Sequence, residues 1–183
     1  MENGASSDLR FLNGDKNGFV DIVKEYKDGL ILFINTIIRD IHIAEDISNE
    51  VFLKLYTRKP RYRSEYSFKT WLYQIAKNTA LNYLKKSKRI NYMSIEDCCY
   101  ISSEQDIEAD YIKDEQNILI HQTLKNLKAE YAQVLYLVYF EGLTNAETAK
   151  VVRKTNKQVS DLIYCAKKAL KKELERRKQD GQV

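Results

Sequence analysis

The sequence predicts an all-α protein made of two small helical domains joined by a flexible acidic linker. Only one proline and six glycines interrupt 183 residues that are rich in helix-forming side chains. Apolar residues recur at three- and four-residue steps through both halves of the chain. The charge is basic in the first half, acidic in the middle and basic again near the end. A helical unit coincides with each basic block, so each block is a candidate polyanion-binding unit.

The first domain is expected to span residues 17–90 as a bundle of three helices. The apolar periodicity predicts a long helix over 17–40 and a second over 43–57, whose outward side is acidic. A loop that holds Pro60 separates them from a third helix over 71–89. The polar segment 1–16 before this domain is expected to be disordered.

The third helix carries a polar face beside its core face. At about 100° per residue, Trp71, Asn78, Asn82, Lys85 and Arg89 fall on one stripe. The stripe of small and apolar residues lies about a quarter-turn away. An indole, two amides and two cations are suited to bases and phosphates, although the indole could instead pack against the preceding loop.

The chain between the two domains loses its periodicity. Residues 91–114 are polar and acidic, with Lys113 the only basic residue from Glu96 to Glu115. A segment of this composition is predicted to be a linker. The second domain is expected over 115–178, followed by a tail, 179–183.

The second domain contains the pattern of a helix-turn-helix. Thr144 with Glu147, and then Thr155 with Gln158, have the spacing of two capping boxes. They predict a short helix over 145–152, a tight turn and a long basic helix. In this arrangement the start of the last helix enters the major groove of DNA. The unit could also be a four-helix bundle that binds protein. The candidate DNA contacts are Asn156, Lys157, Gln158, Ser160, Asp161 and Tyr164.

Several classes of function are not supported. The cysteines and the two histidines have no metal-ligand spacing, so neither a metal, a cofactor nor a disulfide framework is expected. The acids lie mainly in the linker, so no catalytic constellation is predicted and the chain is not expected to be an enzyme. No apolar run approaches the length of a membrane span, and the start is polar, which together predict a cytoplasmic protein without membrane insertion.

Three stretches make the chain resemble the extracytoplasmic-function sigma factors of bacterial RNA polymerase. They are "AEDISNEVFLKLY" (44–56), "SFKTWLYQIAKNTALNYLKK" (67–86) and "LYLVYFEGLTNAETAKVV" (135–152). The resemblance covers nearly all of 17–176 and implies two helical domains on a flexible linker. It also implies that the chain binds core RNA polymerase and directs promoter-specific initiation.

The resemblance implies a role for the polar stripe. In the family the helix matching 71–89 captures unpaired bases of the minus-ten promoter element, with the asparagine matching Asn78 at a base pocket. The preceding loop, 64–70, contributes contacts too. The implied minus-ten residues are Phe68, Lys69, Trp71, Asn78, Asn82, Lys85, Lys86, Lys88 and Arg89.

The resemblance also implies protein partners. Core RNA polymerase would bind through its clamp coiled coil and its flap, and an anti-sigma factor would be a further partner. The clamp-binding residues are expected on the exposed side of the second helix, which could otherwise be a merely solvated face. They are Asp46, Asn49, Glu50 and Leu53.

The last helix departs from the family pattern. Arg153 and Lys154 stand where the family has a turn glycine and an apolar residue. Recognition of the minus-thirty-five element is therefore expected through a different contact set. To the six candidates above, the lysines add Lys154, Lys167 and Lys168.

The alternative function is a helix-turn-helix transcriptional regulator that binds duplex DNA without core polymerase. Such a protein would carry a ligand-binding or dimer-forming first half. The polar stripe and the acidic second helix favour the sigma-factor interpretation instead.

Overall fold

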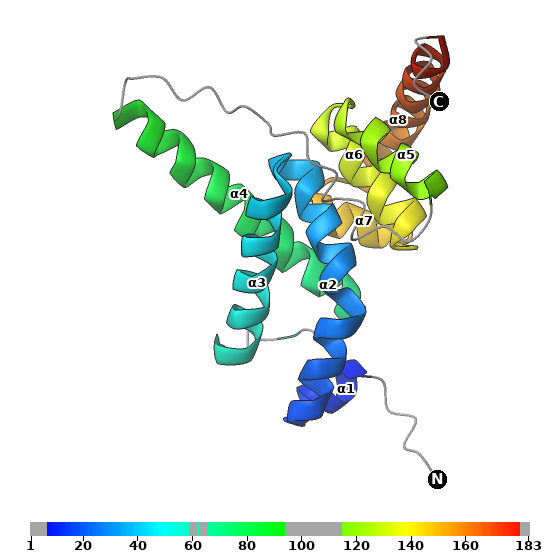
Figure 1. Ribbon diagram of the computed structural model, residues 1–183. Coiled ribbons are helices and arrows are strands. Elements are labelled where there is room, and N and C mark those ends of the chain that lie inside the picture. Colours follow the sequence, from blue (N-terminus) through cyan, green and yellow to red (C-terminus); the bar gives the residue numbers. More distant parts are fainter. Residues whose placement is uncertain (1–6, 59–61, 63–65, 94–114, 180–183) are drawn as a thin grey trace.

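The computed structural model describes residues 7–58, 62, 66–93 and 115–179 (Figure 1). In this part of the chain every regular element is helical, as predicted, and no helix is both long and apolar enough to cross a membrane. The predicted linker lies outside the described residues except for 91–93, and so does the tail except for Gln179. The elements are α1 (Ser7–Leu12), α2 (Lys16–Ile38), α3 (Ile41–Arg58), α4 (Phe68–Met93), α5 (Glu115–Lys125), α6 (Ala129–Leu135), the π-helical turn η2 (Tyr136–Phe140), α7 (Asn145–Val152) and α8 (Asn156–Gln179).

Helices α2, α3 and α4 form the predicted bundle. The Asp15 side chain accepts a hydrogen bond from the Asn17 backbone N–H at 2.9 Å and thereby caps the start of α2. The helix ends at Arg39, whose left-handed backbone (φ 64°) turns the chain toward α3. The apolar stripes meet in a core that includes Ile22, Leu30, Phe33, Val51, Leu55, Leu72 and Ala76.

Helix α1 lies in the segment for which composition predicts disorder, so the disorder expected for 1–16 does not hold from Ser7 onward. The ring of Phe11 packs against Phe19 and Phe68, with centroids 5.7 and 6.4 Å apart. A Cβ on Gly18 would lie 2.6 Å from the Phe11 backbone nitrogen, so the glycine permits the close approach. The helix is ordered by tertiary contacts, which a prediction from composition does not take into account.

The second unit contains the predicted helix-turn-helix in α7 and α8. Thr144 and Glu147 form a complete capping box at the start of α7. At the start of α8, the Thr155 hydroxyl accepts from the Gln158 N–H and the Gln158 side chain accepts from the Thr155 N–H. Both start positions predicted from sequence are therefore confirmed.

The two units pack against each other through η2. Tyr136 is buried, and its hydroxyl donates to the backbone oxygen of Gly29 in α2 at 3.1 Å. Its ring lies 6.2 Å from that of Phe33, so the apolar core is continuous across both units. Figure 1 shows α7 beside the first turns of α4, while the far end of α4 extends away from the second unit. The arrangement of the units could not be predicted from the sequence.

We expect Arg153→Gly to stabilise the protein. Arg153 ends α7 in the left-handed region (φ 59°), where a Cβ costs about 1 kcal/mol and glycine avoids that cost. The free energy of unfolding, followed by circular dichroism, should rise by about 0.5–1 kcal/mol. Arg153→Ala is the matched control because it removes the same charge and keeps the Cβ. Equal stability of the two variants would contradict the conformational explanation.

We also expect acid to destabilise the fold through His121. Burial beside Tyr136 and Phe140 lowers the pKa of this imidazole from 6.5 to about 4. The unfolded chain therefore binds the proton first as the pH falls, and stability is lost between about pH 6.5 and 4, by about 3 kcal/mol in full. Urea unfolding across this range should show a weaker pH dependence in His121→Phe than in the wild type. Identical pH profiles would mean that other groups cause the acid sensitivity.

Candidate nucleic-acid interface

The polar stripe of α4 and the lysines beside it are presented to solvent along the outer half of the helix. Asn82, Lys85, Lys86 and Lys88 are exposed, and Asn78 is half-buried. Arg89, also expected here, lies outside the described side chains. A hollow of about 270 Å³ lies between α3 and this part of α4, with Asn82 and the lysines at positions 54, 85 and 86 among the residues that line it. Amides and lysines at the edge of such a hollow can meet base edges and phosphates together.

Phe68 does not occupy the surface position expected of a base contact. Its side chain is 3% exposed and lies among the rings of Phe11, Tyr26, Tyr62 and Trp71, with centroids 5.4–6.4 Å apart. The predicted helix start at 71 was wrong, because α4 begins at Phe68. Continued back to this residue, the helix places Phe68 four residues before Leu72, on the core face. Its ring holds the start of α4 against α1 and α2.

Trp71 is half-buried, so its position is compatible with both roles that the sequence allows. One is packing against the preceding loop, and the other is contact with a base. Its indole packs edge-on against Tyr62, with centroids 5.4 Å apart, and also contacts Phe68. The Tyr62 hydroxyl in turn donates to the backbone oxygen of Tyr66 at 2.6 Å. The indole is therefore anchored by the loop before α4 and still has an accessible part that could stack on a base.

Two lysines of α4 bind groups of the second unit instead of extending into solvent. Lys69 Nζ donates to the Glu141 backbone oxygen at 2.7 Å and pairs with its carboxylate at 2.8 Å. Lys77 Nζ donates to the Val152 backbone oxygen at 2.8 Å. Burial, and then the positive charges of Lys154 and Arg153, lower the pKa of Lys77 to about 8. No local sequence pattern indicates the partners of these lysines, because the partners belong to the other unit.

The predicted clamp-binding residues lie together on the outer side of α3. Asp46, Asn49, Glu50 and Leu53 are all exposed, and the Leu53 side chain is 61% exposed. Glu50 also forms an i,i+4 ion pair with Lys54. An exposed leucine beside carboxylates is suited to a basic partner helix, because it offers apolar contact and opposite charge together.

The start of α8 forms a second candidate DNA surface. Asn156, Lys157, Asp161 and Tyr164 are exposed, and the Lys168 ammonium lies 4.5 Å from the Tyr164 ring centroid. Four other predicted contacts are exposed or half-exposed and already have partners in the protein. Gln158 caps α8, Ser160 accepts from Asn145, Lys154 pairs with Glu130, and Lys167 lies over Tyr139.

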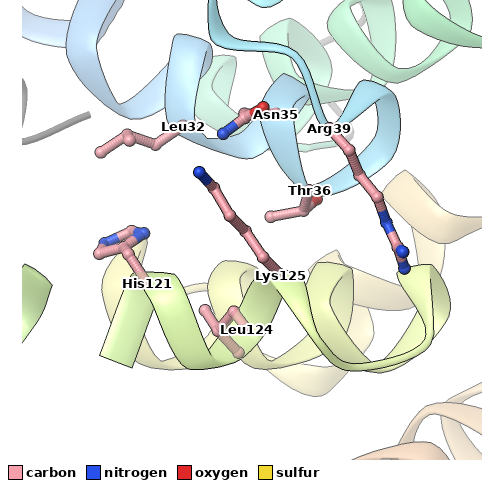
Figure 2. Close-up of a pocket in the computed structure, with 7 residues that line it drawn as sticks. All are labelled: Leu32, Asn35, Thr36, Arg39, His121, Leu124 and Lys125. Carbon is pink, nitrogen blue, oxygen red and sulfur yellow. The ribbon is translucent and has the colours of Figure 1, made fainter. Parts of the chain in front are cut away.

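A further hollow between α2 and α5 is too small to be a ligand site. Figure 2 shows His121 and Lys125 rising from α5 toward α2, with Arg39 reaching down beside them. The Arg39 guanidinium donates to the backbone oxygen of Leu127 at 2.7 Å. The cavity of about 10 Å³ has room for about one water molecule. Among the described residues there is also no group of three or more His, Cys, Asp or Glu that could hold a metal ion.

Comparisons with known proteins match both units. The family described as Sigma-70 region 2 matches residues 22–90, and the one described as Sigma-70, region 4 matches 117–170. The RNA polymerase sigma-H factor of Pseudomonas aeruginosa is 31% identical over 91% of both chains. The ECF RNA polymerase sigma factor SigW of Bacillus subtilis is 28% identical over 88% of this chain and 91% of that protein.

Solved structures share the fold at lower identity. The sigma factor RpoE, solved with the anti-sigma factor NepR from Bartonella quintana, superimposes with a TM-score of 0.66 at 16% identity, over 86% of this chain and 96% of that one. CnrH, solved with the cytosolic domain of CnrY, gives a TM-score of 0.65 at 15% identity, over 92% and 95%. Because both regions match and the relatives match along most of their length, the chain belongs to the sigma-70 family of RNA polymerase sigma factors, in its extracytoplasmic-function group.

Proposed function

We propose that this protein binds core RNA polymerase and directs it to specific promoters, as the names of its relatives indicate for them. The observation that carries the proposal is that one bundle offers two different surfaces. The acidic and apolar side of α3 is suited to a protein helix, and the amide and lysine stripe of α4 is suited to DNA. A regulator that binds duplex DNA without polymerase would not need both of these surfaces.

The stripe on α4 would bind the unpaired strand of the minus-ten element. Asn78 and Asn82 would read base edges, since an amide both donates and accepts hydrogen bonds. Lys85, Lys86 and Lys88 would contact phosphates without sequence preference. Trp71 would stack from its anchored position at the start of the stripe.

The exposed start of α8 would bind the minus-thirty-five element as duplex DNA. Asn156, Lys157 and Asp161 are placed at the end of the helix that enters a major groove in a helix-turn-helix. Tyr164 follows one turn later. Because the chain departs from the family pattern at Arg153 and Lys154, the preferred sequence should also differ.

The proposed role is non-catalytic and belongs to the cytoplasm, where core polymerase acts. An anti-sigma factor is a further proposed partner. Support for it comes from RpoE, which was solved with the anti-sigma factor NepR. The polymerase would supply the catalytic centre, and this chain would supply promoter contacts.

Asn78→Ala should impair promoter melting while leaving core binding intact. Losing one base-edge interaction should cost about 1–3 kcal/mol, which is about fivefold to 150-fold in promoter opening. Permanganate footprinting of the transcription bubble measures the change. Asn13→Ala is the control, since Asn13 is exposed in the turn between α1 and α2 and lies on none of the proposed binding surfaces of α3, α4 and α8. A normal bubble on every minus-ten sequence tested would exclude this role for Asn78.

Asp46→Lys combined with Glu50→Lys should weaken association with core polymerase. Both side chains point away from the bundle, so the helical circular dichroism should be unchanged. Native-gel titration against core enzyme measures the effect. The control variant, Asp28→Lys with Glu175→Lys, makes the same change in net charge at exposed positions on α2 and α8. If both variants bind equally well, the side of α3 is a solvated surface and not a binding face.

A further inference from the structure

The hollow between α3 and α4 brings a lysine of α3 to the stripe that is proposed to bind DNA. Lys54 lines this hollow of about 270 Å³ together with Asn82, Lys85 and Lys86 of α4. The polar stripe is defined on the helical wheel of α4, which cannot include a residue from another helix. Lys54 is therefore a candidate DNA contact that lies outside the predicted set.

Two neighbours hold the ammonium group of Lys54 at the wall of the hollow. Its Nζ forms an ion pair with Glu50, one turn earlier on α3, and donates to Oγ1 of Thr79 on α4 at 3.4 Å. Thr79 is buried, and its hydroxyl donates in turn to the backbone oxygen of Ile75 at 3.0 Å. An ammonium group has three N–H donors, so these two contacts leave a third donor for an oxygen atom in the hollow.

The charges around the hollow favour an anion. Lys54, Lys85 and Lys86 bring three positive charges to its lining, and Glu50 brings one negative charge, so the lining is net positive. Lysine binds phosphate as a point charge and does not need the fixed geometry that a base edge requires. The Lys54 side chain is 30% exposed, so an anion that enters from solvent can reach it.

We propose that Lys54 is a phosphate contact for the unpaired strand bound along α4, and that Glu50 and Thr79 are its positioning residues. One phosphodiester of the strand would lie in the hollow, between Lys54 of α3 and the lysines at positions 85 and 86 of α4. Helix α3 then has two uses, because its outer side faces the polymerase while Lys54 faces the DNA. A lysine that is held in advance loses less conformational entropy when the strand binds. This inference rests on the proposed minus-ten role of α4.

Four variants of the full-length protein separate DNA contact from a structural role. Lys54→Met removes the ammonium group, and Lys54→Arg restores a positive charge at the same place. Thr79→Val removes the hydroxyl that links Lys54 to α4 but keeps the ammonium group and its Glu50 partner. Lys27→Met is the matched control, because Lys27 also pairs with a carboxylate of α3, Glu45 at 3.8 Å, and does not line the hollow.

The measurement is the affinity of each variant, in complex with core polymerase, for a fluorescein-labelled single-stranded oligonucleotide of mixed sequence. Fluorescence anisotropy is followed over a salt series, with core enzyme alone as the blank. Each phosphate contact to a single strand contributes about 0.7 to the slope of log affinity against log salt. Lys54→Met should therefore reduce the slope by about 0.7 and the affinity at about 0.15 M salt by about fourfold. The other three variants should keep the wild-type slope.

A wild-type slope and affinity in Lys54→Met would overturn the proposal, and so would a complex that does not bind the oligonucleotide. An equal loss in Thr79→Val would also overturn it, because Lys54 would then act only by joining α3 to α4. An equal loss in Lys27→Met would show a general effect of net charge instead of a contact. Failure of the proposed function would look different, since the wild type would then form no complex with core polymerase.

Discussion

The structure depends on the contact at which Tyr136 and Glu141 meet α2 beside Gly29. Tyr136 joins the apolar core of one unit to that of the other, and its hydroxyl is satisfied by a backbone oxygen of α2. A Cβ at Gly29 would lie 2.5 Å from the Glu141 carboxylate, so the glycine leaves room for this side chain, which holds Lys69 at the start of α4. Beyond this contact α7 runs along α4. The contact therefore sets the position of the second unit relative to the first.

Three surfaces of different chemistry result from this arrangement. The outer side of α3 combines carboxylates with an exposed leucine, the stripe on α4 combines amides with lysines, and the start of α8 offers mixed polar side chains. The ligands proposed for these surfaces, promoter DNA and a partner helix, are extended, so none of the surfaces needs a deep pocket. The aromatic cluster around Phe68 supports the surface on α4, since it fixes the start of this helix against α1 and α2.

Local patterns in the sequence were sufficient for most of the fold. Apolar periodicity located the long helices, and the two capping boxes located the starts of α7 and α8, because a cap is encoded by side chains three residues apart. The exposed positions on α3 and most of those on α4 also followed from periodicity. What remained unpredictable depends on contacts between distant residues. Helix α1 and the partners of Lys69 and Lys77 all arise from such contacts.

The central claim is that this chain is a promoter-specificity subunit of RNA polymerase. Its most direct test is to mix the purified protein with core RNA polymerase, isolate the complex by gel filtration and assay it for run-off transcription on a library of promoter fragments. The account predicts a one-to-one complex that initiates at a defined subset of promoters on which core enzyme alone is inactive. A chain that binds duplex DNA but forms no complex with core polymerase would contradict it.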